Sequence, residues 1–135
     1  RKSLTSYPEY LNNDKISELK EKICQTMNIS KEHTEGMQGG IYNTNGHFNP
    51  HIDATETNKR TWTCLLYLND VEEGGETRFT KVDISIKPKP GKCIIWYNLN
   101  KDFTVNNKTE HTGTLVKSGT KHIITQWFNN ISDYT

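Results

Sequence analysis

Apolar residues recur at helical spacing near the start of the chain. The stripe consists of Ile16, Leu19, Ile23 and Met27. Residues three and four apart share one face of an α-helix, so this stripe predicts a helix that packs against a sheet. Asn13 or Asp14 can cap its first turn. We expect one further helical turn over residues 30–35 and a short extended segment over residues 2–6.

From Gln38 onward the apolar pattern changes to the alternation that is typical of strands. The clearest strand covers residues 61–68. Alternation places Thr63, Leu65 and Tyr67 on one face, and Trp62, Cys64, Leu66 and Leu68 on the other. Shorter strands are expected over residues 39–43, 77–79, 84–87 and 92–97, the last of them buried. The first of these brings Tyr42 inward, and the Asn43–Gly46 segment is a turn.

The last part of the chain predicts a hairpin. Residues 111–116 and 120–128 would pair around a turn at 117–119. In its second strand, Lys121, Ile123, Thr125 and Trp127 share one face. Many short strands after one helix predict a mostly β fold with an N-terminal helix and a double-stranded β-helix (jelly-roll) core. We expect one domain over residues 1–135, with helical support over about 1–37 and the jelly-roll over about 38–130.

Composition narrows the classes of function. The chain has 17 basic and 16 acidic residues and a net charge of +1, so no basic surface for nucleic acid is indicated. No apolar run reaches membrane-spanning length. The three cysteines form no CxxC pair. Cys64 and Cys93 lie in apolar runs and are expected to be small buried side chains. Cytoplasm and secretory lumen are both left open as locations.

A candidate metal site is centred on His51 and Asp53. Residues two apart in a strand point to the same side, so an imidazole and a carboxylate would face one point, and His111 from a distant strand would complete a set of three. Two histidines and one carboxylate form the facial triad of non-heme Fe(II) oxygenases, although Mn(II), Co(II) and Zn(II) accept the same ligands. The competing interpretation is a chance H-x-D with a surface histidine.

Lys121 strengthens the metal interpretation. It shares a face with Thr125 and Trp127 in an otherwise apolar strand, and a buried ammonium group without an anion is costly. An acidic co-substrate would provide that anion. The alternative is that Lys121 reaches solvent at the strand end.

Four stretches carry a family resemblance. In chain order they are GGIYNTNGHFNPHIDA, KRTWTCLLYLNDVEEGGETRF, IKPKPGKCIIWYNL and HTGTLVKSGTKHIITQWF. Across about residues 38–128 the sequence resembles the catalytic domain of the prolyl 4-hydroxylases, in the Fe(II)/2-oxoglutarate dioxygenase superfamily. The spacing of H-x-D, VEEGGET, the distal histidine and a lysine ten residues later makes this resemblance specific.

The resemblance implies a role for each matching residue. His51, Asp53 and His111 would bind iron, and Lys121 would pair with the far carboxylate of 2-oxoglutarate. Tyr42 would help to hold that carboxylate, with Tyr67 and Thr63 lining its pocket. Trp127 would lie near iron and substrate, or serve only as core packing.

The implied reaction is hydroxylation of peptidyl proline to 4-hydroxyproline, coupled to decarboxylation of 2-oxoglutarate to succinate and CO2. It would use Fe(II), 2-oxoglutarate and O2, with ascorbate as reductant and a proline-containing peptide as partner. The oligomeric state is left open, and upstream elements of the family are expected to be missing before Arg1.

Three departures leave the acceptor open. Phe48 and Asn129 stand where relatives often have tyrosine and histidine, and the loop over residues 54–59 is short. The alternatives are another peptidyl residue, a proline in a regulatory protein, or a jelly-roll binding module without activity.

Overall fold

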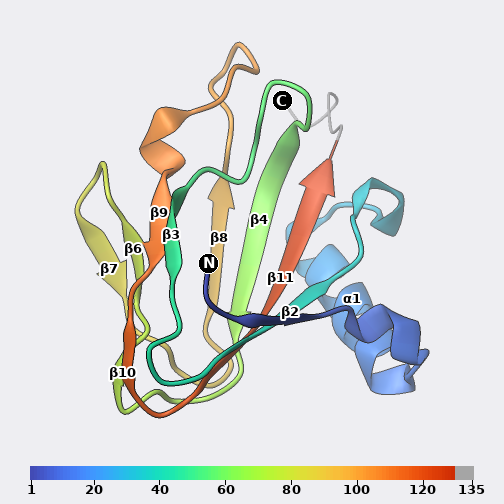
Figure 1. Cartoon of the computed structure of the whole chain (residues 1–135). Helices are drawn as coiled ribbons and strands as arrows, with labels where there is room; N and C mark the ends of the chain where they lie inside the picture. The colour runs from blue at the N-terminus through green and yellow to red at the C-terminus, as the bar shows by residue number, and fades with distance from the viewer. Residues whose placement is uncertain (130–135) are drawn as a thin grey trace.

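Two antiparallel sheets face each other, and a helix packs outside the larger one (Figure 1). The computed structural model describes residues 1–129. The larger sheet has the strand order β1 (Leu4–Ser6), β2 (Gln38–Tyr42), β11 (Lys121–Asn129), β4 (Arg60–Tyr67) and β8 (Cys93–Tyr97). The smaller sheet has the order β3 (Phe48–His51), β9 (His111–Gly113), β6 (Thr77–Phe79) and β7 (Ile84–Ile86). This arrangement confirms the prediction of a mostly β fold with an N-terminal helix.

Further short elements lie outside these two sheets. β5 (Glu73–Gly74) pairs with β10 (Val116–Ser118) in a two-stranded ribbon. Three 3-10 helices cover Pro8–Leu11 (η1), Lys31–His33 (η2) and Asn107–Thr109 (η3). Among the described residues, no helix is long and apolar enough to cross a membrane.

The helix α1 (Asp14–Met27) forms as its apolar stripe predicts. Asn13 caps it by accepting a hydrogen bond from the backbone N–H of Lys15 at 2.8 Å. The helix ends at Asn28, which adopts the left-handed conformation with φ 55°. The stripe packs on the outer face of the larger sheet. There it forms part of a buried cluster that contains Ile23, Cys24, Ile29, Met37, Cys64, Ile124 and Phe128.

A second buried cluster lies between the sheets. It consists of Tyr42, Leu65, Tyr67, Val116 and Ile123, with Phe48, Val71, Ile86, Ile94 and Trp96 packed against it. Leu65 and Tyr67 therefore face inward, while Cys64 and its even-numbered neighbours Trp62 and Leu66 face the helix. The alternation predicted for β4 is confirmed, and so is the inward position of Tyr42.

The predicted hairpin over residues 111–128 is wrong. β9 pairs with β3 and β6 in the smaller sheet, whereas β11 pairs with β2 and β4 in the larger one. β10, between them in sequence, pairs with β5 instead. β11, the longest apolar strand of this region, is more stable between two strands than beside one short neighbour. Both of its edges are then hydrogen-bonded.

The prediction that residues 92–97 form a buried strand is also wrong in part. β8 lies at the edge of the larger sheet, and Ile95 remains 41% exposed. Cys93 is likewise exposed, although it was expected to be buried, while Cys64 on the adjacent central strand is buried as predicted.

Candidate metal centre

Two imidazoles and one carboxylate converge between the sheets. His51 ends β3 and His111 begins β9, and the two residues are direct partners in the strand register. Asp53 follows β3 by two residues. Nε2 of His51 and Nε2 of His111 each lie 3.4 Å from Oδ1 of Asp53. One ligand atom from each of the three side chains lies within 4.8 Å of the others.

The other nitrogen of each imidazole is engaged by the backbone. Nδ1 of His51 lies 2.7 Å from the carbonyl oxygen of Asn49, and Nδ1 of His111 lies 2.8 Å from that of Thr109. A carbonyl only accepts, so each Nδ1 carries a proton and each Nε2 faces Asp53, where it can donate a proton to the carboxylate or give a lone pair to a metal. Three lone-pair donors facing one point attract a cation.

The spacing fits a divalent ion with open positions. Neighbouring ligands around an octahedral ion with bonds of about 2.1 Å are roughly 3 Å apart, close to the observed 3.4 Å. Structural zinc sites usually have four protein ligands, whereas this set has three. The site can therefore hold a metal and leave coordination positions free for other molecules.

Asp53 is held through its second oxygen. Oδ2 accepts hydrogen bonds from Oγ1 of Thr63 at 2.7 Å and from Nε1 of Trp127 at 3.1 Å. Burial alone would raise the pKa of Asp53, but hydrogen bonds from His111, His51 and Thr63 outweigh it and keep that pKa well below its usual range. The carboxylate is therefore ionised at neutral pH and oriented toward the imidazoles.

Charge on His111 is controlled by the same carboxylate. Burial works against a charged imidazole, yet the hydrogen bond and the attraction of Asp53 prevail and raise the pKa of His111. Asp53 thus draws positive charge into the site, either as a proton on His111 or as a bound cation.

Lys121 is a buried cation that lines the same cavity as the three candidate ligands. It is 2% exposed, and its Nζ lies 5.1 Å from the ring centroid of Tyr42 and 5.8 Å from that of Tyr67. Burial lowers the pKa of Lys121 to about 8, although nearby Glu76 partly opposes the shift. Lys121 forms no ion pair with any residue in the described part of the chain.

These groups surround one narrow cavity of about 40 Å³. Its lining includes Tyr42, Thr63, Trp127 and Lys121 together with the three candidate metal ligands. Lys121, Ile123, Thr125 and Trp127 all line it, so their predicted common face on β11 is confirmed. Phe48 stacks on His51 with ring centroids 3.8 Å apart.

Thr63 lines the cavity and Tyr67 does not, although both were expected to line a co-substrate pocket. Tyr67 is fully buried outside the cavity lining, and its hydroxyl is hydrogen-bonded to Thr77, which does line the cavity. Thr63 lines the cavity, but its hydroxyl donates to Asp53.

Sequence reasoning missed a chain of polar groups behind Asp53. Nδ2 of Asn98 donates to Oγ1 of Thr63 at 2.8 Å, and Oδ1 of Asn98 accepts from Nε1 of Trp96 at 2.7 Å. Asn98 is fully buried. A lone amide directly after the apolar run IIWY was the available signal, because a buried amide requires hydrogen-bond partners.

An arginine clamp on Trp127 was also missed. The guanidinium of Arg60 lies 3.8 Å from the ring centroid of Trp127 and donates two hydrogen bonds to Glu35, at 2.7 and 3.0 Å. This stacked, bidentate arrangement restricts the indole that donates to Asp53. Glu35 lies 25 positions from Arg60, and no sequence pattern links the two.

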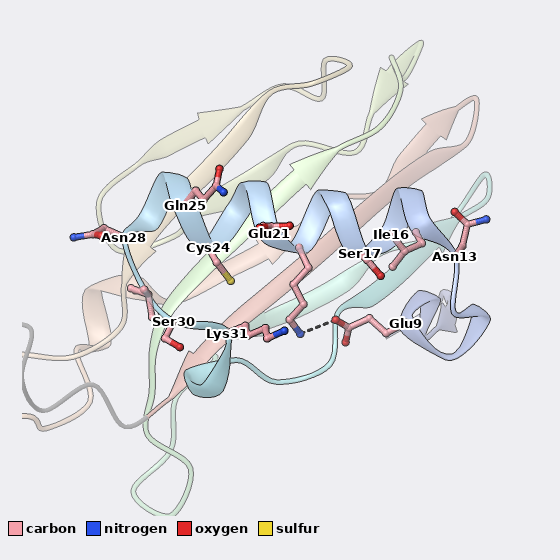
Figure 2. A pocket seen from close by; sticks show the side chains of 12 residues that line it. Glu9, Asn13, Ile16, Ser17, Glu21, Cys24, Gln25, Asn28, Ser30 and Lys31 are labelled. Atoms are coloured by element: carbon pink, nitrogen blue, oxygen red, sulfur yellow. Dashed lines mark ion pairs between the residues drawn. The ribbon is translucent and has the colours of Figure 1, made fainter.

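A larger hollow of about 640 Å³ lies elsewhere, between α1, η1 and η2 (Figure 2). Lys20 lines it and forms an ion pair with Glu9 at 2.6 Å. Among the residues that the structure describes, the only set of three metal-ligating side chains lies at His51, Asp53 and His111, outside this hollow. Size alone therefore does not mark the site of chemistry.

Comparison with known sequences agrees with this geometry. The sequence model of the 2OG-Fe(II) oxygenase superfamily matches residues 37–129. "Probable prolyl 4-hydroxylase 10" of Arabidopsis thaliana is 30% identical over 83% of this chain and 48% of its own length. "Prolyl 4-hydroxylase subunit alpha-2" of Gallus gallus is 28% identical over 96% of this chain and 26% of its own. The chain thus spans about half, or less, of the length of these curated relatives.

Solved structures show the same fold. The viral collagen prolyl hydroxylase of Paramecium Bursaria Chlorella virus-1, solved as a 2OG complex, is 27% identical with a TM-score of 0.83, covering 98% of this chain and 82% of that one. A prolyl hydroxylase of Trichoplax adhaerens, at 17% identity and a TM-score of 0.58, shares the fold. The jelly-roll prediction and the resemblance to prolyl 4-hydroxylase domains are confirmed. The chain therefore belongs to the 2OG-Fe(II) oxygenase superfamily.

Proposed function

We propose that this chain hydroxylates peptidyl proline to 4-hydroxyproline, coupled to decarboxylation of 2-oxoglutarate to succinate and CO2. The observation that carries the proposal is the convergence of two imidazoles and one carboxylate beside a buried, unpaired ammonium group. The names of the relatives, which are prolyl 4-hydroxylases, support proline as the acceptor.

In this proposal His51, Asp53 and His111 hold Fe(II), which supplies the O2 activation that no side chain can provide. The protonated Nδ1 atoms keep both Nε2 lone pairs directed at the metal position. Thr63 and Trp127 fix the rotation of the Asp53 carboxylate, so that Oδ1 faces the same position.

Lys121 receives the far carboxylate of 2-oxoglutarate, and Tyr42 borders the same end of the cavity. A charge-assisted hydrogen bond to a buried ammonium is strong because little water competes for it. Phe48, which stacks over His51, lines the same narrow cavity.

The acceptor peptide binds beside Phe48 and Trp127, whose rings line the cavity together with the metal ligands. Closure of the site by the peptide would exclude water from the reacting atoms. Ascorbate serves as reductant when turnover is not coupled to hydroxylation.

The test is an aerobic assay with Fe(II), 2-oxoglutarate, ascorbate and two proline-rich peptides, one with a collagen-like repeat and one without. We expect succinate and a peptide heavier by one oxygen atom on proline, in equal amounts. His111→Ala should abolish both products, whereas His122→Ala, a change on the strand that carries Lys121, should retain them. Succinate without peptide oxidation would exclude these prolines as acceptors, and neither product would indicate a binding module.

A further inference from the structure

Two thiols meet on the face of the larger sheet opposite the metal centre. Sγ of Cys64 and Sγ of Cys93 lie 2.8 Å apart, within about 0.8 Å of the length of a disulfide bond. Cys64 is on the central strand β4 and Cys93 on the edge strand β8. Their register explains the contact, because Leu66 is the direct partner of Cys93 and Cys64 precedes Leu66 by two residues on the same face.

The two sulfur atoms have different surroundings. Cys64 is buried in the cluster beneath α1, whereas Cys93 is exposed at the sheet edge. An external oxidant can therefore reach Cys93, while Cys64 is positioned to react only with its neighbour. An exposed attacking thiol with a buried partner in contact is the arrangement that favours a disulfide over a lasting mixed adduct.

From this geometry we infer that Cys64 and Cys93 form a reversible intrachain disulfide that ties β8 to β4. The oxidant is a low-molecular-weight disulfide such as glutathione disulfide. The Cys93 thiolate attacks one of its sulfur atoms, forming a mixed disulfide and releasing one glutathione thiolate. The Cys64 sulfur then attacks Cys93, the mixed bond breaks, and the Cys64 proton goes to the second glutathione. Two thiols are oxidised and one glutathione disulfide is reduced to two thiols.

The chemistry of the pair agrees with this order. The hydrogen bond from Cys64 lowers the pKa of Cys93 despite the effect of burial, so Cys93 supplies the thiolate. The same contact, followed by burial, raises the pKa of Cys64 and keeps it protonated until the mixed disulfide forms. Cys24 has no such partner and is buried in the helix–sheet cluster, where burial raises its pKa.

A bond here would hold an edge strand of the larger sheet in place. Among residues 1–129, β8 pairs in the larger sheet with β4 alone, so its other edge lacks strand hydrogen bonds and can fray. The cross-link closes a loop between residues 64 and 93, which restricts the unfolded chain. The inference does not depend on the proposed function, because the sulfur atoms and the metal ligands lie on opposite faces of the sheet.

The test oxidises the metal-free 135-residue chain with glutathione disulfide and digests it with trypsin without reduction. Cleavage after Arg60, Arg78, Lys92 and Lys101 isolates Cys64 in residues 61–78 and Cys93 in residues 93–101, while Cys24 falls in residues 23–31. We expect the first two peptides to be joined, with Cys24 free. The intact protein should be lighter by two hydrogen atoms.

Stability gives a second readout. Oxidation should raise Tm by on the order of 5–10 °C in the wild-type chain and in Cys24→Ser, and dithiothreitol should reverse the rise. Cys93→Ser, a change at an exposed position, should show neither the linked peptide nor the rise in Tm.

Other outcomes would overturn the inference. These are a lasting glutathione adduct on Cys93 with Cys64 still reduced, a dimer linked through Cys93, and two unreacted thiols. A linked peptide pair that includes residues 23–31 would likewise contradict it. Because the wild-type chain alone distinguishes these results, the test does not depend on the folding of any variant.

Discussion

Thr63 donates a 2.7 Å hydrogen bond to Oδ2 of Asp53, whose other oxygen lies 3.4 Å from Nε2 of both candidate ligand imidazoles. β4, which belongs to the larger sheet, thus positions a carboxylate that follows β3 of the smaller one. The hydroxyl is itself held by Asn98. The geometry of the metal centre therefore depends on contacts that cross between the two sheets.

Thr63→Val should weaken metal binding, because it removes this donor while keeping the shape of the side chain. Groups that orient a ligand typically change metal affinity 10–100-fold, and we expect a loss of about tenfold because Trp127 still donates to Oδ2. Calorimetric titration with Co(II) would measure the loss. Thr61→Val is the matched control, since Thr61 lies on the same strand but donates to the carbonyl of Phe128. Equal affinities in the two variants would refute the role of Thr63.

Lys121→Met should stabilise the fold while removing the response to 2-oxoglutarate. Burial lowers the pKa of this lysine from 10.5 to about 8, which corresponds to about 3 kcal/mol of destabilisation below pH 8. A methionine of similar shape avoids that cost, so Tm of the variant should exceed that of the wild type at pH 7. The difference should be smaller at pH 10, where the wild-type lysine is already neutral in the folded state. Thermal unfolding at both pH values measures the effect. A lower Tm at pH 7 would contradict it.

Lys121→Ala should mainly raise the 2-oxoglutarate concentration needed for turnover, because it removes the proposed partner of the far carboxylate and leaves the three metal ligands in place. The apparent affinity for 2-oxoglutarate, measured by succinate release, is the readout. Unchanged affinity would show that another group receives this carboxylate.

Affinity for 2-oxoglutarate should fall as the pH rises above about 8. The folded-state pKa of Lys121 lies near 8, so the ammonium group is present below that pH and is lost above it. Above pH 8, the affinity for 2-oxoglutarate should therefore fall by up to tenfold for each pH unit. Calorimetry with the Co(II)-loaded chain from pH 6.5 to 9.5 tests this. Lys121→Arg should give a flatter profile, because guanidinium keeps its charge throughout. A flat wild-type profile would exclude Lys121 as the titrating group.

Gly74→Ala should destabilise the chain more than Gly91→Ala. Both glycines have φ +80°, a conformation that favours glycine. A Cβ at Gly74 would also overlap the carbonyl oxygen of Leu115, whereas one at Gly91 would have no atom of residues 1–129 within 4 Å. We expect Gly91→Ala to cost about 1 kcal/mol and Gly74→Ala clearly more. Urea unfolding compares the two, and equal losses would show that the contact of Gly74 with the Leu115 segment is unimportant.

Local patterns determined much of the fold from the sequence alone. The stripe from Ile16 to Met27 predicted α1, and the alternation around Leu65 predicted which side chains of β4 share a face. The two-residue spacing of His51 and Asp53 predicted that they share a side. These features follow from helix and strand periodicity, which is visible in the order of apolar and polar residues.

Only the tertiary structure decided which strands become neighbours. It separated β9 from β11, which local pattern predicted as a hairpin, and it placed His111 opposite His51. It also brought Thr63 to Asp53, Glu35 to Arg60, and Cys64 to Cys93. Periodicity specifies the face of each strand but not its partner, because pairing is selected by the burial and hydrogen bonding of the whole assembled chain.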